Sequence, residues 1–188
     1  MKFKPSRVAG GVTVELGPRD RRVPMPGPAE EWAPLSPIAL RRILVPLDFS
    51  ACSRKALCYA LPLARQFKAA LVLVNVVQTP ALVGEGEAAV LPTLESQMKA
   101  GAERELKAWV EREIPAGVKA TALVRCGSPY REIVAAAQEV NADLIVLSTH
   151  GHTGLKHVFL GSTAESVVRH ATCPVLVVRE KEHDFVPA

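Results

Sequence analysis

Hydrophobic and polar residues follow a regular pattern from residue 42 onward. Five short runs rich in Val, Leu and Ile are typical of buried strands, and they cover residues 42–47, 70–77, 118–124, 143–148 and 174–179. The longer stretches between them repeat apolar residues every three or four positions, which predicts amphipathic helices. Alternating strands and helices form a parallel sheet through right-handed crossovers. We therefore predict an α/β fold: a five-stranded parallel open sheet with helices on both faces.

Local signals mark where the helices begin. Ser50 is the N-cap candidate of a first helix predicted over 51–67, and a second helix is predicted over 92–113. Ser128 fits the N-cap of a third helix, and Pro129 fits its first turn, where the missing N–H is harmless. The starts of the first and third helices are therefore marked by capping residues as well as by the hydrophobic pattern.

The segment between residues 148 and 165 has the pattern of a strand end, a glycine-containing loop and a helix start. Ser162 and Glu165 match the S-x-x-E capping box, so we expect Ser162 to be the N-cap of a fourth helix. Gly151 and Gly161 allow backbone N–H groups to turn toward a ligand, and a helix N-terminus adds unpaired donors. This pattern predicts a site for a phosphate-sized anion. The alternative is a loop that only connects strand and helix.

The first 38 residues differ in composition from the rest. Seven of the fifteen prolines lie before residue 40, together with glycines and a basic cluster. We predict a disordered basic extension over 1–38, with a short edge strand at 12–16 as the alternative. The folded domain is then expected over 39–180, followed by a tail over 181–188.

The charge distribution argues against nucleic acid as a partner. The chain carries a net charge of +4, but residues 1–42 hold eight Lys or Arg against four acids. Residues 43–188 therefore hold fifteen of each sign. A neutral domain lacks the basic surface that nucleic-acid binding normally needs.

The hydropathy pattern predicts where the protein is located, and the cysteines and histidines indicate whether it binds a metal ion. The chain has no apolar run long enough to span a membrane and no pattern of a secretory signal, so we expect no membrane association and a cytoplasmic location. The four cysteines show no C-x-x-C spacing and predict neither zinc nor a disulfide framework. Three histidines lack the accompanying acids of a metal site, so no metal ligands are predicted; they are His150, His152 and His157.

The loop residues resemble the nucleotide-binding branch of the universal stress protein family. Its signature is G-x2-G-x9-G-[S/T], and Gly151, a nine-residue spacer and Gly161-Ser162 match it, whereas Ser148 stands where the family has its first glycine. The Ser148 side chain could either add a hydrogen bond or crowd the ligand. The resemblance extends over 42–179 and includes three further stretches, Ile43–Asp48, Arg125–Pro129 and Arg169–Val178.

The resemblance implies a Rossmann-like fold of the adenine-nucleotide α-hydrolase-like type, with strand order 3-2-1-4-5. It also implies that the protein binds ATP. Asp48 would accept from a ribose hydroxyl, and Val76 would approach the adenine. Mg²⁺ or Mn²⁺ would be held mainly by the phosphates. The implied nucleotide-binding residues are Pro46, Leu47, Asp48, Val76, Ser148, His150, Gly151, Gly161, Ser162 and Thr163. The family resemblance also implies a homodimer through the final strand, Val175–Val178.

Binding is favoured over catalysis. The chain lacks the phosphate loop of P-loop NTPases, the G-x-G-x-x-G of dehydrogenases and the G-x-S-x-G of serine hydrolases. The family resemblance therefore implies an ATP-binding stress-response module with a regulatory or protective role. The alternatives are a nucleotide-independent dimerisation and interaction protein, or a slow ATPase.

Overall fold

A computed structural model describes residues 2–5, 12–15, 38–78, 91–149 and 161–179. The chain divides into two compact units, residues 1–38 and 39–188. In the first unit, β1 (Lys2–Pro5) pairs antiparallel with β2 (Val12–Glu15). A strand is present at Val12–Glu15, within the range 12–16 expected as the alternative, but it belongs to a two-stranded sheet with β1 and is not an edge strand of the five-stranded sheet. Most of the extension predicted to be disordered, and the tail 181–188, lie outside the described residues.

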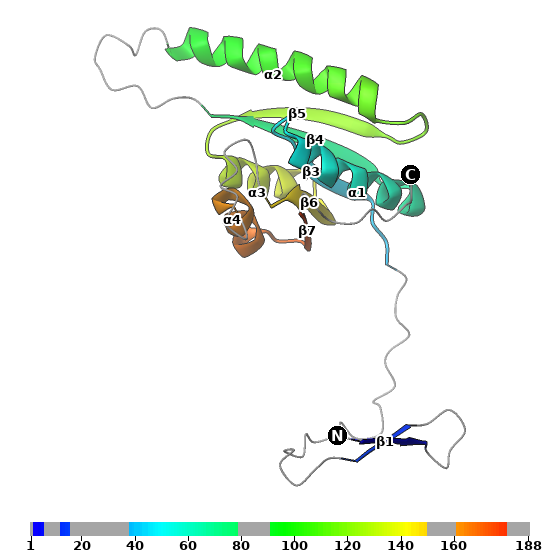
Figure 1. Cartoon of the computed structure of the whole chain (residues 1–188). Coiled ribbons are helices and arrows are strands. Elements are labelled where there is room, and N and C mark those ends of the chain that lie inside the picture. Colours follow the sequence, from blue (N-terminus) through cyan, green and yellow to red (C-terminus); the bar gives the residue numbers. More distant parts are fainter. Residues whose placement is uncertain (1, 6–11, 16–37, 79–90, 150–160, 180–188) are drawn as a thin grey trace. The chain divides into compact units, whose positions relative to one another are not determined.

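The second unit contains a parallel sheet of five strands, as predicted (Figure 1). Its order is β5-β4-β3-β6-β7, which is 3-2-1-4-5 when the strands of this sheet are counted along the chain. The order implied by the family resemblance is thus confirmed. The strands are β3 (Arg42–Pro46), β4 (Ala70–Val77), β5 (Ala120–Cys126), β6 (Leu144–Ser148) and β7 (Val175–Val178).

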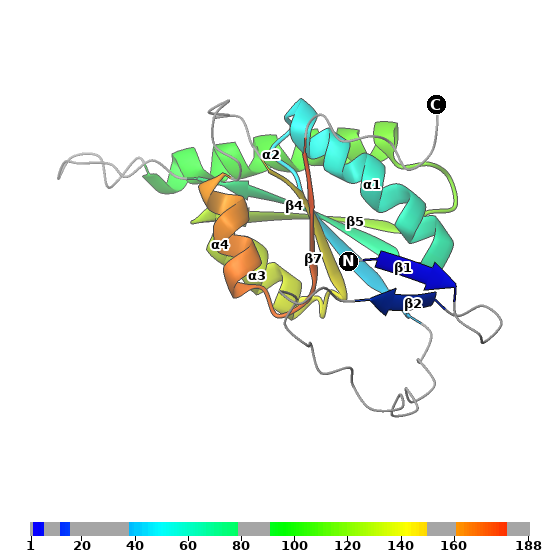
Figure 2. The ribbon, with the colours of Figure 1, turned by 60° about the horizontal axis from the view of Figure 1, so that its bottom comes forward.

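Within the described residues, four helices cover the two faces of this sheet (Figure 2). One face carries α1 (Ala51–Phe67) and α2 (Leu91–Glu113), and the other carries α3 (Pro129–Glu139) and α4 (Ser162–His170). The bounds of the five strands, and those of α1 and α2, lie within two residues of the ranges predicted from the hydrophobic pattern.

Successive residues of the central strands enter different core layers. Ile43 and Val45 of β3 pack in the cluster that includes α1 and α2, whereas Leu44 packs with α3 and α4. All three are fully buried. Burial on both faces explains why these strands are continuously apolar, and each buried side chain of this size contributes about 1.5 to 3 kcal/mol.

The ends of α1 show how local sequence sets helix bounds. Ser50 is the predicted N-cap, and its Oγ accepts from the Ser53 N–H at 3.1 Å. At the other end Lys68 adopts a left-handed conformation with φ 55°, and its N–H donates to carbonyls of the last turn. The Ala69 N–H donates to the Ala64 carbonyl at 2.9 Å, which completes a Schellman-type ending.

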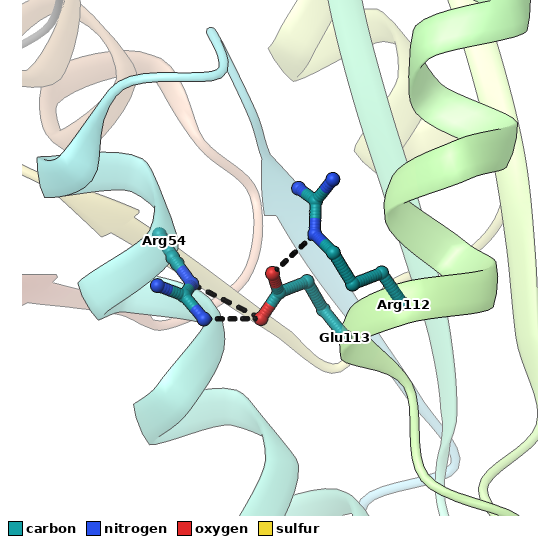
Figure 3. Close-up of polar contacts among 3 residues, drawn as sticks. All are labelled: Arg54, Arg112 and Glu113. Atoms are coloured by element: carbon teal, nitrogen blue, oxygen red, sulfur yellow. Dashed lines mark hydrogen bonds and ion pairs between the residues drawn. The ribbon is translucent and has the colours of Figure 1, made fainter.

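An ion-pair cluster joins α1 to the end of α2 (Figure 3). The Glu113 carboxylate accepts from Arg54 at 3.0 Å and from Arg112 at 2.9 Å. Hydrogen bonding from Arg112 lowers the pKa of Glu113; burial opposes this effect, and Arg54 adds to it. Glu113 therefore stays ionised beside two arginines and ties the two helices together.

Candidate functional site

A cleft of about 370 Å³ opens at the carboxyl ends of β3 and β6. From β3 the chain builds the sheet toward β4 and β5, and with β6 it continues on the other side of β3. Such a reversal of winding is where open α/β sheets bind ligands, and the volume suits a small molecule. The cleft is lined by Pro46, Leu47, Asp48, Ser53, Val74, Asn75, Val76, Gln78, Pro129, Ile133, Leu147, Ser148, Thr149, Gly161, Ser162, Thr163 and Ala164.

The cleft exists because β3 and β6 separate before they end. Their pairing stops at Leu44 and Ile145, while β3 stays paired with β4 as far as Pro46. The Leu47 N–H donates to Val74 of β4 at 2.8 Å. Because strand N–H groups alternate between neighbours, the Pro46 nitrogen faces β6, where no hydrogen bond is needed. The proline therefore costs no sheet hydrogen bond at this edge.

Asp48 links the cleft to the start of α1. Its Oδ1 accepts from the Ser50 N–H at 3.1 Å and from the Ser50 Oγ at 2.6 Å. Between them Phe49 adopts a left-handed backbone with φ 64°, an uncommon conformation for a bulky residue. Its ring packs edge-on against Trp109 with centroids 5.6 Å apart. Asp48 thus lines the cleft and also supports the N-cap residue of α1.

The start of α4 corrects one prediction. Gly161, and not Ser162, occupies the N-cap, and the Glu165 N–H donates to the Gly161 carbonyl at 2.9 Å. The predicted capping box is therefore wrong: Ser162 is the first helical residue, and the Glu165 carboxylate pairs with Arg169 at 2.9 Å. The S-x-x-E pattern by itself is compatible with Ser162 at the N-cap or at the first helical position. The extended backbone of Gly161 shows that Gly161 is the N-cap. Ser162 thereby stands exposed at the edge of the cleft.

The loop between β6 and α4 is closed at its base by backbone hydrogen bonds. The Gly161 N–H donates to the Thr149 carbonyl at 2.8 Å, and the Thr149 N–H donates to Val178 of β7 at 3.0 Å. Thr149 is 4 % exposed. His150 and Gly151 were predicted as site residues, but they lie outside the described residues, as do the other two loop histidines.

The structure brings the remaining predicted residues into one cleft. The end of β3 and the two residues after it supply Pro46, Leu47 and Asp48; β4 supplies Val76, β6 supplies Ser148, and the start of α4 supplies Gly161, Ser162 and Thr163. The cleft also contains four polar residues that no sequence motif indicated: Asn75, Gln78, Ser53 and Thr149. Asn75 carried the clearest signal, because it is a polar residue inside an otherwise apolar strand.

The described lining of the cleft combines apolar and polar groups. Apolar side chains from β4 and α3 form an apolar wall, among them Val76, Pro129 and Ile133. Hydroxyl side chains and the N-terminal backbone of α4 also line the cleft, and the N–H groups and dipole of a helix N-terminus favour an anion. Asp48 is the one charged side chain in the described lining. Within the described ranges no cluster of three or more His, Cys, Asp or Glu residues could hold a metal ion.

This arrangement defines a doubly wound α/β protein with a ligand-sized cleft at its switch point. The family model of the universal stress protein family matches residues 39–179, and the chain belongs to that family. It is 34% identical over 144 residues to universal stress protein MJ0531 of Methanocaldococcus jannaschii, covering 77% of this chain and 85% of that protein.

Two solved structures resemble the fold. Universal stress protein UspA from Lactobacillus plantarum matches with a TM-score of 0.68 at 29% identity, over 76% of this chain and 99% of that chain. A universal stress protein in complex with cAMP matches with a TM-score of 0.51 at 25% identity, over 77% of this chain and 100% of that one. No helix in the described part of the chain is long and apolar enough to cross a membrane.

Proposed function

We propose that this protein binds ATP, or a closely related adenine nucleotide, in the cleft at the carboxyl ends of β3 and β6. One observation carries the proposal: a single cleft holds an apolar wall, a carboxylate and a helix N-terminus. These three features match the base, the sugar and the phosphates of a nucleotide. The complex of one structural neighbour with cAMP supports the same class of ligand.

The chemistry of the lining suggests how the nucleotide lies. The phosphates face Gly161, Ser162 and Thr163, because backbone N–H groups at a helix N-terminus stabilise anions. The ribose lies near Asp48, and the adenine packs against the apolar wall beside Val76. Ser148, and with it His150 and Gly151 from the loop, belongs to the phosphate end in this proposal. Mg²⁺ or Mn²⁺ would be held by the phosphates and water, since the described lining offers one carboxylate.

Isothermal titration calorimetry with ATP and Mg²⁺ tests the proposal. Gly161→Val should abolish the binding signal, because it places branched bulk where the backbone must approach the phosphates. Its φ of −66° and ψ of 150° are accessible to valine, so the variant should still fold. Gly101→Val is the matched control, since an added Cβ there meets nothing within 4 Å. Absence of binding by the wild-type protein at millimolar ATP would refute the proposal and favour the nucleotide-independent interaction protein.

The cellular role we propose is that of a cytoplasmic, nucleotide-sensitive regulatory or protective module in the stress response. Family membership supports the stress role. Four free cysteines suit a reducing compartment. Slow hydrolysis of ATP is the remaining alternative, and finding no ADP after long incubation with excess protein would remove it.

We further propose a homodimer through β7. Within the described sheet β7 pairs with β6 alone, which leaves one strand edge open, and its sequence Val175–Val178 is wholly apolar. An open apolar edge promotes association with another chain. Sedimentation velocity should therefore give a dimer for the wild-type protein and a monomer for Val177→Lys, which adds a charge at the half-buried edge. A wild-type monomer would contradict this proposal.

A further inference from the structure

Asn75 is the one residue of β4 with a polar side chain, and it is only 7 % exposed. Its neighbours along the strand, Val74 and Val76, are apolar. A buried amide is unfavourable unless it makes hydrogen bonds, so we expect the Asn75 side chain to have a specific hydrogen-bond partner. Asn75 also lines the cleft.

The Asn75 side chain binds the last carbonyl of the β3 segment. Its Nδ2 donates to the Leu47 carbonyl oxygen at 2.8 Å, in a buried position. In a continued parallel ladder that acceptor would take the Val76 N–H, because the Leu47 N–H donates to the Val74 carbonyl. The hydrogen bond that the structure shows comes instead from the side chain. Asn75 therefore replaces the last rung between β3 and β4.

This replacement affects two groups of the cleft at once. The Leu47 carbonyl and the Asp48 N–H belong to the same peptide plane. A hydrogen bond that fixes the Leu47 oxygen therefore also fixes the orientation of the Asp48 backbone N–H, and with it the direction in which the chain enters Asp48. On the other strand, the backbone N–H of Val76 is on the side of β4 that faces β3 and the cleft. The residues after Asp48 also constrain it: Phe49 has a left-handed backbone, and Ser50 donates two hydrogen bonds to the Asp48 carboxylate.

We propose that Asn75 is a positioning residue of the nucleotide site: its amide takes the Leu47 carbonyl out of the strand ladder and thereby aims Asp48 at the sugar of the ligand. The inference rests on the proposed function, since it assigns Asp48 to the sugar. The orientation of the Asn75 amide is defined by this contact, because a flipped amide would place the Asn75 oxygen against the Leu47 oxygen. The selectivity for sugar hydroxyls therefore depends on a residue of the neighbouring strand.

Three variants test this role. Asn75→Leu keeps a similar volume without a donor, and Asn75→Asp keeps the shape with an acceptor in place of the donor. Asn75→His is the conservative variant, because its Nδ1 is the same number of bonds from Cα as the Asn Nδ2. Affinities are measured for Mg·ATP and for Mg·2′,3′-dideoxyATP, which lacks both sugar hydroxyls.

We expect wild-type protein to prefer ATP over the dideoxy nucleotide by about tenfold or more, the value of one charge-assisted hydrogen bond. Asn75→Leu and Asn75→Asp should lose most of this preference, as should Asp48→Asn, while binding the dideoxy nucleotide about as well as the wild type. Asn75→His should restore the preference. A loss of affinity for both nucleotides by the same factor would indicate a merely structural role and would overturn the inference.

A measurement without nucleotide separates this inference from the proposed function. In the wild-type protein, NMR should detect a coupling across the hydrogen bond between the Asn75 Nδ2 and the Leu47 carbonyl carbon. The Asp48 amide signal should shift in Asn75→Leu and return in Asn75→His. If the wild type does not bind ATP, the proposed function fails and with it the ligand part of the inference. If it binds ATP but the coupling is absent, or the preference is unchanged in Asn75→Leu, the inference alone fails.

Discussion

Replacing Asp143 by asparagine tests how the far end of the sheet is held. Asp143 lies just before β6, and its Oδ2 accepts from the backbone N–H groups of Arg41 and Arg42 at 2.7 and 2.8 Å. The Asp143 N–H also donates to the Arg42 carbonyl at 2.9 Å. One carboxylate therefore joins the starts of β3 and β6, the two strands that separate at their other ends.

These hydrogen bonds stabilise the ionised form of the Asp143 carboxyl group. Burial raises the pKa of Asp143, but hydrogen bonds from the Arg42 and Arg41 backbones and the nearby positive charges outweigh it, so the pKa is lowered overall. A carboxyl group with a lowered folded pKa stabilises the fold above its unfolded pKa of about 3.9. That contribution is lost as the pH falls through the folded value.

The expected size follows from the two contacts. Hydrogen bonds to a charged group contribute about 1.5 to 3 kcal/mol and neutral ones about 0.5 to 1.5. The amide of the variant keeps one neutral acceptor, and both contacts are near solvent, so Asp143→Asn should lower the free energy of unfolding by about 1 to 2 kcal/mol at pH 7. Its melting temperature should fall by about 2 to 8 °C.

Urea denaturation at pH 7 and at pH 3 measures this effect. The difference between wild type and Asp143→Asn should be full at pH 7 and smaller at pH 3, where the carboxylate begins to be protonated. Equal stability at pH 7, or an undiminished difference in acid, would refute the reasoning. Because Asp143 lies at the opposite end of the strands from the cleft, the variant should also bind ATP like the wild type.

Two further predictions concern α1 and its contacts. Lys68→Gly should raise the free energy of unfolding by about 0.5 to 1 kcal/mol in urea denaturation, because glycine adopts the left-handed C-cap conformation without strain; an unchanged or lower stability would contradict this. Glu113→Gln should lower stability by about 0.5 to 1 kcal/mol at pH 7, since its arginine partners Arg54 and Arg112 are largely exposed. Because the pKa of Glu113 is lowered, the deficit should shrink as the pH falls below about 4, and a deficit constant with pH would exclude the ion pair as its cause.

The fold could be predicted from local signals because they agree with one another. The helix predicted over 51–67 has the same bounds in the structure, with Ser50 as N-cap. The strand predicted over 118–124 is observed at Ala120–Cys126, and it is one of the two edge strands of the described sheet, where partial exposure weakens the hydrophobic pattern. The strand order came from the family resemblance and not from the pattern itself.

The site could be predicted only in part, because its remaining contacts depend on tertiary structure. The start of α4 was misplaced by one residue, since Gly161 and Ser162 can both precede a helix and local sequence does not decide between them. Asn75 was missed because its hydrogen bond joins two strands through residues that are 28 positions apart. A polar residue in an apolar strand signals such a contact, but the partner becomes visible only in the folded sheet.

The central claim is that an adenine nucleotide binds at the carboxyl ends of β3 and β6. An NMR titration of the isotope-labelled protein with Mg·ATP tests it most directly. We predict saturable shifts of the Asp48, Val76, Ser162 and Thr163 amides, and little change at Asp143 on the far side of the sheet. Shifts confined to other residues, or none at millimolar ATP, would contradict the claim.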